Sequence, residues 1–315
     1  MVRHQPVLAK EIYEHLPKNL SLYFDGTFGH GGHVEHILSQ PPFGFSPRRG
    51  EGAPTAVGAE EGLGGRGVII PKIIACDLDP TMMQKGLEFT KQRTSQITPI
   101  ISSYAHIDQI WKQYGPFDFM LLDLGVNMEH FKDSQRGFSI KTDAPLDMRF
   151  SQDNSITAKD IVNKYSLEQL SDILISYGDY SPKSAEYLAK GIIQARQKRP
   201  IETTQQLTEV LSHLKCNQKK IAIIFQVLRI ETNKELEQLE IFLTKFGERL
   251  TPWGRCAIIT YHSIEDRITK LAFKALAESK SFQLINKKVI QPHYTEIQQN
   301  KAARSAKLRI IEKRY

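Results

Sequence analysis

Three acidic residues each follow a short apolar run in this sequence, and their spacing suits binding of a nucleoside. The acids are Asp25, Asp77 and Asp123, and the runs span 22–24, 73–76 and 117–122. If the runs are parallel strands, their carboxyl ends meet at one edge of a sheet. We therefore expect Asp77 to accept hydrogen bonds from ribose hydroxyls and Asp123 to lie near the reactive end of a cofactor. A plain capping role after the strand is the alternative for Asp123.

Glycines gather directly after the first acid, in the stretch Gly26-Thr27-Phe28-Gly29-His30-Gly31-Gly32-His33. Apolar residues at helical spacing follow at 34–38. Strand, glycine-rich turn and helix open a doubly wound sheet, in which the backbone approaches a ligand and helix N–H groups face its negative group. The spacing matches neither the dinucleotide fingerprint nor a P-loop, so S-adenosylmethionine fits better than NAD. A turn needed only for chain geometry is the alternative.

Residues 41–71 differ in composition from the rest of the chain. They hold eight of the twenty glycines and five of the fifteen prolines, a composition that buries too little apolar surface to order itself. We interpret them as a flexible insertion. Asp25 and Asp77 lie 52 positions apart, and without the insertion the separation is 21, as in a strand–helix–strand unit.

Further strands are predicted at 97–104, 256–260, 282–290 and 306–311, and Asp79-Pro80 predicts a helix start running to about Gln92. About 130 residues separate the fourth and fifth strands, and much of this span is helical. Capping boxes are predicted at Ser166 with Gln169 and at Thr203 with Gln206. We expect an α/β domain formed by 1–140 and 221–315, interrupted by a small helical domain at 141–220.

Charge and cysteine content favour an intracellular, nucleic-acid-related protein. Lys and Arg exceed Asp and Glu by seven, which leans toward a polyanionic partner, and basic residues gather near the C-terminus. The three cysteines have neither disulfide nor metal-ligand spacing, so we expect a reducing cytoplasm and no metal. No segment resembles a signal peptide or a membrane span.

Seven ordered motifs give a more specific indication. They are Gly26–His33, Leu121-Leu122-Asp123-Leu124-Gly125-Val126, Arg136-Gly137-Phe138-Ser139, Pro145-Leu146-Asp147-Met148-Arg149, Phe225-Gln226-Val227-Leu228-Arg229-Ile230, His262-Ser263-Ile264-Glu265-Asp266-Arg267 and Ala303-Arg304-Ser305-Ala306-Lys307-Leu308-Arg309. Together they resemble the RsmH/MraW family, the cytosine-N4 methyltransferases of small-subunit ribosomal RNA. The resemblance runs from His4 to the C-terminus, excluding 41–71.

The resemblance implies a class I S-adenosylmethionine-dependent methyltransferase, a Rossmann-like α/β fold with a seven-stranded sheet and an inserted helical domain. It implies methylation of the N4 exocyclic amine of a decoding-centre cytidine in 16S rRNA, within the small ribosomal subunit. The cofactor positions of the family fall on Gly31, Gly32, His33, Asp77, Tyr104 and Asp123. Tyr104 stands where relatives commonly have Phe. Where the family usually has a cofactor-contacting Gln this chain has His130, which is the candidate for that contact here.

Several residues are candidates for catalysis or RNA binding. Asp123 and Asp147 could accept N–H bonds from the target amine and take up its developing positive charge. His262 could line the site, although it also fits a helix N-cap pattern. For RNA phosphates the candidates are Arg149, Arg304, Lys307 and Arg309. Their alternatives are an ion pair of Arg149 with Asp147 and, for the other three, a charged strand edge.

Three alternatives to the rRNA enzyme stay open. They are a methyltransferase acting on another nucleic acid or on protein, a non-catalytic RNA-binding assembly factor that keeps the fold, and, most weakly, a dehydrogenase. The oligomeric state is also open, with a homodimer as one option.

Overall fold

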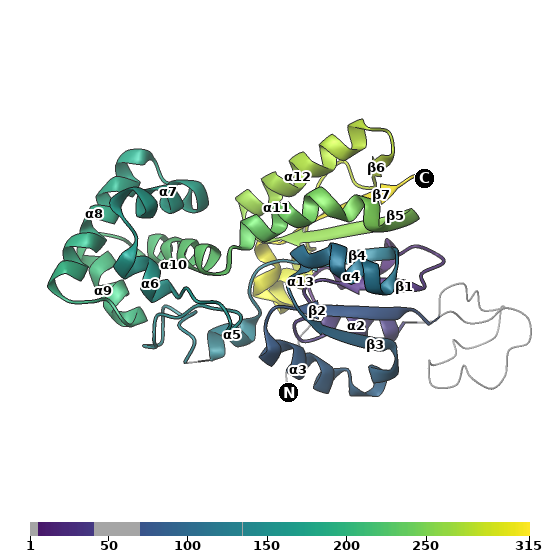
Figure 1. The fold of residues 1–315 in the computed structure, drawn as a ribbon, viewed down its shortest axis with the longest axis horizontal. Helices are drawn as coiled ribbons and strands as arrows, with labels where there is room; N and C mark the ends of the chain where they lie inside the picture. Colours follow the sequence, from purple (N-terminus) through teal and green to yellow (C-terminus); the bar gives the residue numbers. More distant parts are fainter. Residues whose placement is uncertain (1–5, 41–69, 134) are drawn as a thin grey trace, which may run out of the picture. The chain divides into compact units, whose positions relative to one another are not determined.

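The computed structural model describes residues 6–40, 70–133 and 135–315 (Figure 1). The predicted insertion at 41–71 lies outside the described residues except for Ile70 and Pro71. The chain divides into two compact units, one formed by Met1–Gly125 with Gln238–Tyr315 and the other by Val126–Glu237. We call them the sheet unit and the helical unit.

The sheet unit contains a seven-stranded sheet in the order β3-β2-β1-β4-β5-β7-β6. The strands are β1 (Leu22–Asp25), β2 (Lys72–Asp77), β3 (Ile97–Ile101), β4 (Phe117–Asp123), β5 (Leu250–Thr260), β6 (Phe282–Leu284) and β7 (Lys307–Lys313). β1 to β5 pair in parallel, whereas β7 runs antiparallel to both β5 and β6. The predicted seven-stranded α/β sheet is confirmed.

Two strands are shorter than predicted. β3 ends at Ile101 because Ser103 caps the following 3-10 turn, its Oγ accepting a hydrogen bond from the N–H of Ala105 at 3.0 Å. β6 ends at Leu284, although Ile285 and Asn286 still hydrogen-bond to β7, and Ile290 returns to β7 as an isolated bridge.

The apolar run of β4 is explained by burial on both faces of the sheet. Phe119 and Leu121 belong to one hydrophobic cluster, whereas Met120 and Leu122 belong to another on the opposite face. A strand covered on both sides shows continuous apolar residues rather than alternation. Because β1, β2 and β4 are parallel, their terminal acids all lie at the same edge of the sheet.

Helices and 3-10 turns complete the sheet unit. They are α1 (Ala9–Glu14), α2 (Gly32–Leu38), α3 (Pro80–Phe89), η1 (Lys91–Gln96), η2 (Tyr104–His106), α4 (Ile107–Tyr114), α11 (Glu235–Lys245, which begins in the helical unit), η3 (Phe246–Arg249), α12 (Ser263–Glu278), α13 (Tyr294–Gln299) and η4 (Lys301–Ser305). The predicted N-cap at Asp79 is confirmed, since its carboxylate accepts from the N–H groups of Thr81 and Met82, but α3 ends at Phe89.

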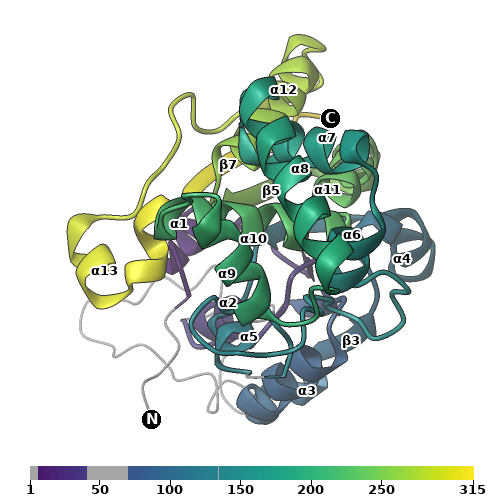
Figure 2. The same ribbon diagram turned by 90° about the vertical axis from the view of Figure 1, so that its left-hand side faces the viewer.

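The helical unit has different boundaries from the predicted 141–220. Its helices are α5 (Met128–Lys132), α6 (Ala158–Lys164), α7 (Leu167–Gly178), α8 (Pro182–Lys198), α9 (Thr204–His213) and α10 (Gln218–Asn233), visible in Figures 1 and 2. The unit begins earlier because Phe138 lies in its core. It ends later because α10 is one continuous helix whose Phe225 and Leu228 pack in that core. The predicted segments 1–140 and 221–315 are corrected accordingly.

Both capping boxes predicted for this unit, at Ser166 and at Thr203, are present. No helix within the described ranges is both long enough and apolar enough to span a lipid bilayer.

Candidate active site

The glycine-rich turn after β1 is fastened to both neighbouring strands. The N–H of Gly26 donates to Leu121 O of β4 at 2.9 Å, and the N–H of Phe28 donates to Cys76 O of β2 at 2.9 Å. The hydroxyl of Thr27 accepts from the N–H of Asp123 at 2.6 Å. The turn therefore holds a fixed position at the carboxyl edge of the sheet, beside the acids that end the strands.

Two of the turn's glycines are required by packing within the protein. Gly31 caps α2 with a left-handed backbone (φ 70°), which disfavours any other residue. A Cβ on Gly26 would lie 2.3 Å from Cδ2 of the buried Leu122. At Gly32, by contrast, a Cβ would meet Pro6 alone among the described residues, at 3.4 Å. The described part of the protein therefore does not itself require a glycine at this predicted cofactor position.

Asp77 is held by the turn and by the start of α3. Its Oδ2 accepts from the N–H of Gly29 at 2.7 Å, and its Oδ1 accepts from the N–H of Asp79 at 2.8 Å. Burial raises the pKa of Asp77 to about 6, although these two hydrogen bonds act against the rise. A third backbone hydrogen bond, from Leu78, also acts against the rise, and the four lone pairs of the carboxylate leave acceptor capacity for a ribose hydroxyl.

Tyr104 lies beside the same turn. It opens η2 after β3, and its Cβ would lie 3.0 Å from a Cβ built on Gly26. Its ring contacts Phe242 edge to face, with 5.8 Å between ring centroids. Tyr104 is half-buried and follows β3, the neighbour of the strand that Asp77 ends. Its contact with Phe242 fixes the plane of the ring, as stacking on adenine would need.

Asp123, His33 and Tyr261 form a cluster at the end of β4. The Tyr261 hydroxyl donates to Asp123 Oδ1 at 2.8 Å, and His33 Nε2 lies 3.3 Å from Asp123 Oδ2. His33 is 7% exposed, and neither ring nitrogen makes a hydrogen bond with other described residues. Burial, and after it the charge of Asp123, raises the pKa of Tyr261 well above its ordinary value. Tyr261 is therefore a neutral hydrogen-bond donor to this carboxylate at physiological pH.

A second carboxylate lies beneath this cluster. Asp25 is 2% exposed and accepts from the Tyr23 hydroxyl at 2.9 Å and from the N–H of Thr27 at 3.2 Å. Burial raises the pKa of Asp25 to about 6, and the charge of His33 and the bond from Tyr23 offset part of the rise. At neutral pH the fold therefore carries a buried carboxylate that is mostly ionised, and its burial makes that charge costly.

This shift predicts a pH-dependent effect of Asp25→Asn on stability. Between pH 4 and 6 the folded state binds more protons at Asp25 than the unfolded state does, so the free energy of unfolding falls as pH rises through this window. A shift of this size corresponds to about 2 to 3 kcal/mol. We expect Asp25→Asn to be more stable than the parent by about 2 kcal/mol at pH 7.5, with the difference vanishing near pH 4. Urea unfolding at both pH values measures it, and a pH-independent difference would contradict it.

Asp147 and Arg149, both in the helical unit, are bound to each other. Arg149 donates from Nε and Nη2 to the two Asp147 oxygens, each at 2.8 Å, and its remaining N–H groups donate to Gln152 and Asn154. Burial alone would raise the pKa of Asp147, but the hydrogen bonds and charge of Arg149 outweigh it and lower that pKa. All five guanidinium donors are used within one loop. This geometry favours the structural alternative for Arg149 over phosphate contact.

His130 is packed inside the helical unit. It is 5% exposed, and its ring lies 5.0 Å from Phe138 and 5.3 Å from Phe150, between ring centroids. Its Nδ1 accepts from the N–H of Asn127, which closes the capping box of α5. These contacts explain the residue without a ligand, and a cofactor contact by His130 stays a prediction.

His262 takes the capping position that the sequence left as its alternative. It is the N-cap of α12, and its Nε2 lies 2.9 Å from Glu265 Oε1. The same Glu265 carboxylate accepts from the N–H of Tyr261 at 2.9 Å. His262 therefore helps to hold the turn that carries Tyr261 toward Asp123, and a direct catalytic role stays a prediction.

The basic residues near the C-terminus are arranged differently from the expectation. Lys307 and Arg309 both pair with Asp266 of α12, at 3.2 and 2.7 Å. Arg304 does not share a strand face with them, because it lies in η4, before β7 begins. Lys307 and Arg309 alternate along β7, whereas Arg304 does not extend that row, and RNA contact by these residues stays a prediction. Asp266 offsets part of the positive charge that Lys307 and Arg309 would offer to a phosphate. Arg304 is exposed.

Tyr261 and Thr27 are the site residues that the sequence analysis missed. Tyr261 comes directly after the predicted strand 256–260, so the rule that identified Asp123 at the end of β4 would also have found it. Thr27 lies inside the glycine-rich turn, but only the structure shows its hydroxyl accepting from the backbone of β4.

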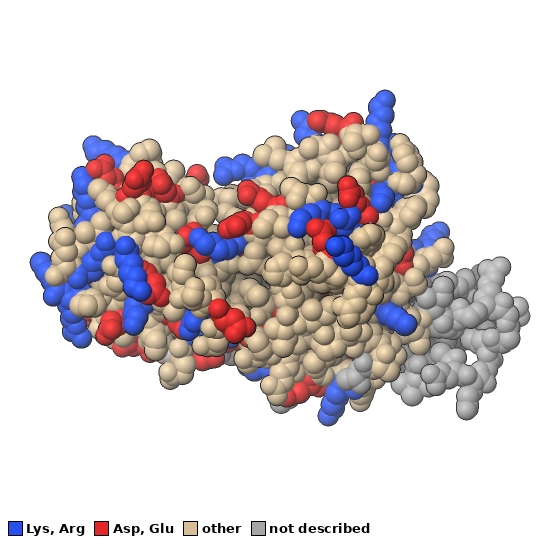
Figure 3. Space-filling model, in the orientation of Figure 1, with Lys and Arg blue, Asp and Glu red and all other residues tan. Residues whose placement is uncertain are grey.

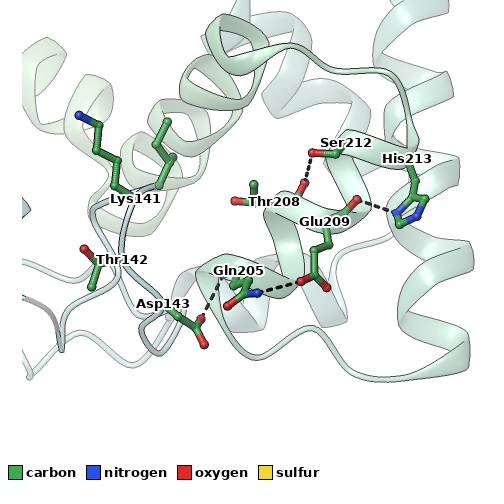
Figure 4. Close-up of a pocket in the computed structure, with 9 residues that line it drawn as sticks. Lys141, Thr142, Asp143, Gln205, Thr208, Glu209, Ser212 and His213 are labelled. Carbon is green, nitrogen blue, oxygen red and sulfur yellow. Dashed lines mark hydrogen bonds between the residues drawn. The ribbon is translucent and has the colours of Figure 1, made fainter.

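A hollow of about 450 Å³ lies elsewhere, in the helical unit (Figure 4). The loop 140–143 forms one wall and a polar face of α9 the other. Its polar groups largely bond to one another, as Gln205 does with Asp143 and Glu209. None of the predicted site residues lines it.

Comparison with known proteins finds relatives of this chain over nearly its full length. Residues 67–314 match the model of the MraW methylase family. The ribosomal RNA small subunit methyltransferase H of Coprothermobacter proteolyticus is 35% identical over 321 residues, covering 99% of this chain and 96% of that protein. The protein of the same name from Bacteroides fragilis is 38% identical over 331 residues, covering 99% and 97%. The chain belongs to the MraW methylase family.

Proposed function

We propose that this chain is an S-adenosylmethionine-dependent methyltransferase that methylates the N4 exocyclic amine of a cytidine in 16S rRNA. The observation that carries the proposal is the cluster of Asp123, His33 and Tyr261 beside Asp77, at the carboxyl edge of a sheet ordered β3-β2-β1-β4-β5-β7-β6. Family membership supports it, because the relatives described above are named as methyltransferases of small-subunit rRNA.

The residues at this edge suit the parts of S-adenosylmethionine. Asp77 has acceptor capacity left for ribose hydroxyls, and Tyr104 presents an aromatic ring for adenine. The buried ring nitrogens of His33 lack hydrogen bonds within the described residues, as expected of a side chain that awaits a polar ligand. When bound, S-adenosylmethionine supplies a methyl group activated by a positively charged sulfur.

The protein's task is mainly to orient the amine and to take up charge. A cytosine amine is a weak nucleophile because its lone pair is delocalised into the ring. Correct alignment can supply about 7–11 kcal/mol in favourable cases. A carboxylate that accepts from the amine N–H groups opposes this delocalisation and stabilises the positive charge that develops on nitrogen. Asp123 is our candidate, since the Tyr261 hydroxyl bonds to one of its oxygens and His33 lies near the other, and it can also receive the proton that the methylated nitrogen loses.

The base must be unpaired to reach such a site, so we propose that the target cytidine is presented in a loop or splayed out of its stack. The assembled small subunit in the cytoplasm is the substrate that we propose. The three cysteines are unpaired and buried, which agrees with a reducing compartment. Light scattering on the purified protein tests the homodimer option.

Incubation with methyl-labelled S-adenosylmethionine and small subunits lacking the modification tests the proposal directly. Nucleoside analysis of the 16S rRNA should show label in N4-methylated cytidine. Label in another nucleoside, or in ribosomal protein, would assign a different substrate. Absence of label together with no calorimetric binding of the cofactor would favour a non-catalytic RNA-binding factor.

A further inference from the structure

One part of the helical unit carries a concentrated positive charge. Residues 181–220 contain eight Lys or Arg residues and three Asp or Glu residues, a net charge of 8 − 3 = +5. The whole chain has a net charge of +7, so these 40 residues carry much of the surplus. Figure 3 shows Lys and Arg atoms gathered over α8 and α9, at the left of the view. The C-terminal cations considered earlier offer less net positive charge, because Asp266 pairs with two of them, Lys307 and Arg309.

Two contacts place the connection between α9 and α10 along α8. A Cβ built on Gly191 of α8 would lie 2.4 Å from the side chain of Leu214, which follows α9. The Tyr180 hydroxyl, just before α8, donates to Lys220 O of α10 at 3.4 Å. Exposed side chains of these segments therefore form one surface. We call it the α8–α10 basic face, and it consists of Lys183, Tyr187, Lys215, Lys219 and Lys220.

The lysines of the α8–α10 basic face are available to a ligand. None of the four has an ion-pair partner within the described ranges of the chain. The neighbouring acids are Glu186, which pairs with Lys190, and the exposed Asp179. The face therefore keeps a positive surplus.

An aromatic ring stands among these charges. Tyr187 is 56% exposed, an unusual environment for a large ring in a helix whose apolar side is otherwise buried. It lies one helical turn after Lys183, so both side chains share one face of α8. Exposed rings beside cations are the arrangement with which proteins bind single-stranded nucleic acid, by stacking on bases and by contacts to phosphates.

We propose that the α8–α10 basic face binds an unpaired stretch of RNA, with the lysines on its phosphates and Tyr187 stacked on a base. The inference rests on the proposed function, because it assigns a second contact between the enzyme and its rRNA substrate. It also moves the main RNA contact away from the C-terminal strand to the helical unit. A duplex would not fit as well, because its bases are not exposed for stacking.

Fluorescence anisotropy with a labelled 12-nucleotide oligocytidylate tests the charge contribution. A variant with Lys183, Lys215, Lys219 and Lys220 all changed to Ala should bind at least about tenfold more weakly at low salt, and its slope of log affinity against log salt should be smaller by roughly 2 to 3. The control changes four exposed lysines of the sheet unit, Lys10, Lys112, Lys270 and Lys274, to Ala. It should bind like the parent protein. Equal weakening in both variants would overturn the proposal.

Tyr187 separates stacking from charge. Tyr187→Ala should weaken binding by about tenfold with an unchanged salt slope, and Tyr187→Trp should restore it. On small subunits, both the lysine variant and Tyr187→Ala should raise KM while kcat and the calorimetric Kd for S-adenosylmethionine stay at parent values.

The outcomes distinguish this inference from the proposed function. If the parent methylates small subunits and the two variants do so with parent KM, the inference fails and the function stands. If the parent binds the oligonucleotide through this face but methylates nothing, the proposed function is contradicted and RNA binding by the α8–α10 basic face is supported. If the lysine variant loses affinity for phosphatidylglycerol vesicles and keeps its affinity for RNA, the face is a membrane surface and the proposal is overturned.

Discussion

Asp123→Asn is expected to lower kcat for methyl transfer at least about 100-fold, as loss of one preorganised charge-stabilising group typically does. The amide keeps the shape of the carboxylate but loses its negative charge. Its Oδ1 can still accept from Tyr261, whereas its NH₂ group would face His33 and could not receive a proton from the target amine. Single-turnover methylation of small subunits measures the rate, and calorimetry on the same samples measures the Kd for S-adenosylmethionine. We expect the rate to fall by a much larger factor than the affinity.

Asp118→Asn is the matched control, because Asp118 is the second residue of the same strand that Asp123 ends. Its Oδ2 accepts from the N–H and hydroxyl of Ser21 at 2.9 and 2.8 Å, and its Oδ1 accepts from the Thr251 hydroxyl at 3.0 Å. These bonds join strands at the edge of the sheet opposite the site. The control should lower the free energy of unfolding and leave kcat unchanged. If both variants lost kcat alike, Asp123 would have no special part in the reaction.

The strands and their terminal acids could be predicted because their signals are local. An apolar run of four to seven residues ending in an acid is complete within a few positions, and a strand buried on both faces cannot be mistaken for an alternating one. The carboxyl edge of the sheet, and with it the neighbourhood of Asp77 and Asp123, followed from parallel pairing alone.

The partners of charged side chains could not be predicted in the same way. Asp266 lies 41 and 43 positions from the two cations it binds, and Tyr261 lies 138 positions from Asp123. A count of basic residues near the C-terminus contains no information about which of them the fold neutralises. The domain boundary failed for a related reason, since only the packing of α10 shows that its apolar face belongs to the helical unit.

Glycines were the weakest sequence signal for the binding site. A glycine is required both where the backbone approaches a ligand closely and where it approaches another part of the protein closely, and the sequence does not distinguish the two. Gly86 illustrates this outside any recognised motif. It lies in α3, where Ala would ordinarily be more stable, and only the structure shows that it faces the glycine-rich turn.

Gly86→Ala is therefore expected to destabilise the protein although it improves helix propensity. The gain in propensity is about 1 kcal/mol. Against it, the new Cβ would lie 2.5 Å from Gly29 O and 2.5 Å from the ring of Phe28, which is buried. A backbone oxygen and a packed ring cannot move aside without shifting the turn, so we expect a net loss of about 2 kcal/mol in the free energy of unfolding.

The shift should also reach the cofactor. Movement of Gly29 strains the hydrogen bond from its N–H to Asp77 Oδ2, and loss of a bond to a charged group corresponds to about tenfold or more in affinity. Calorimetric titration with S-adenosylmethionine measures this loss at a temperature where the variant is folded. Gly191→Ala is the control, since its Cβ would meet the Leu214 side chain at 2.4 Å in the helical unit. It should cost stability and leave the cofactor Kd unchanged, whereas a parent-like Kd in Gly86→Ala would show that α3 does not set the position of the turn.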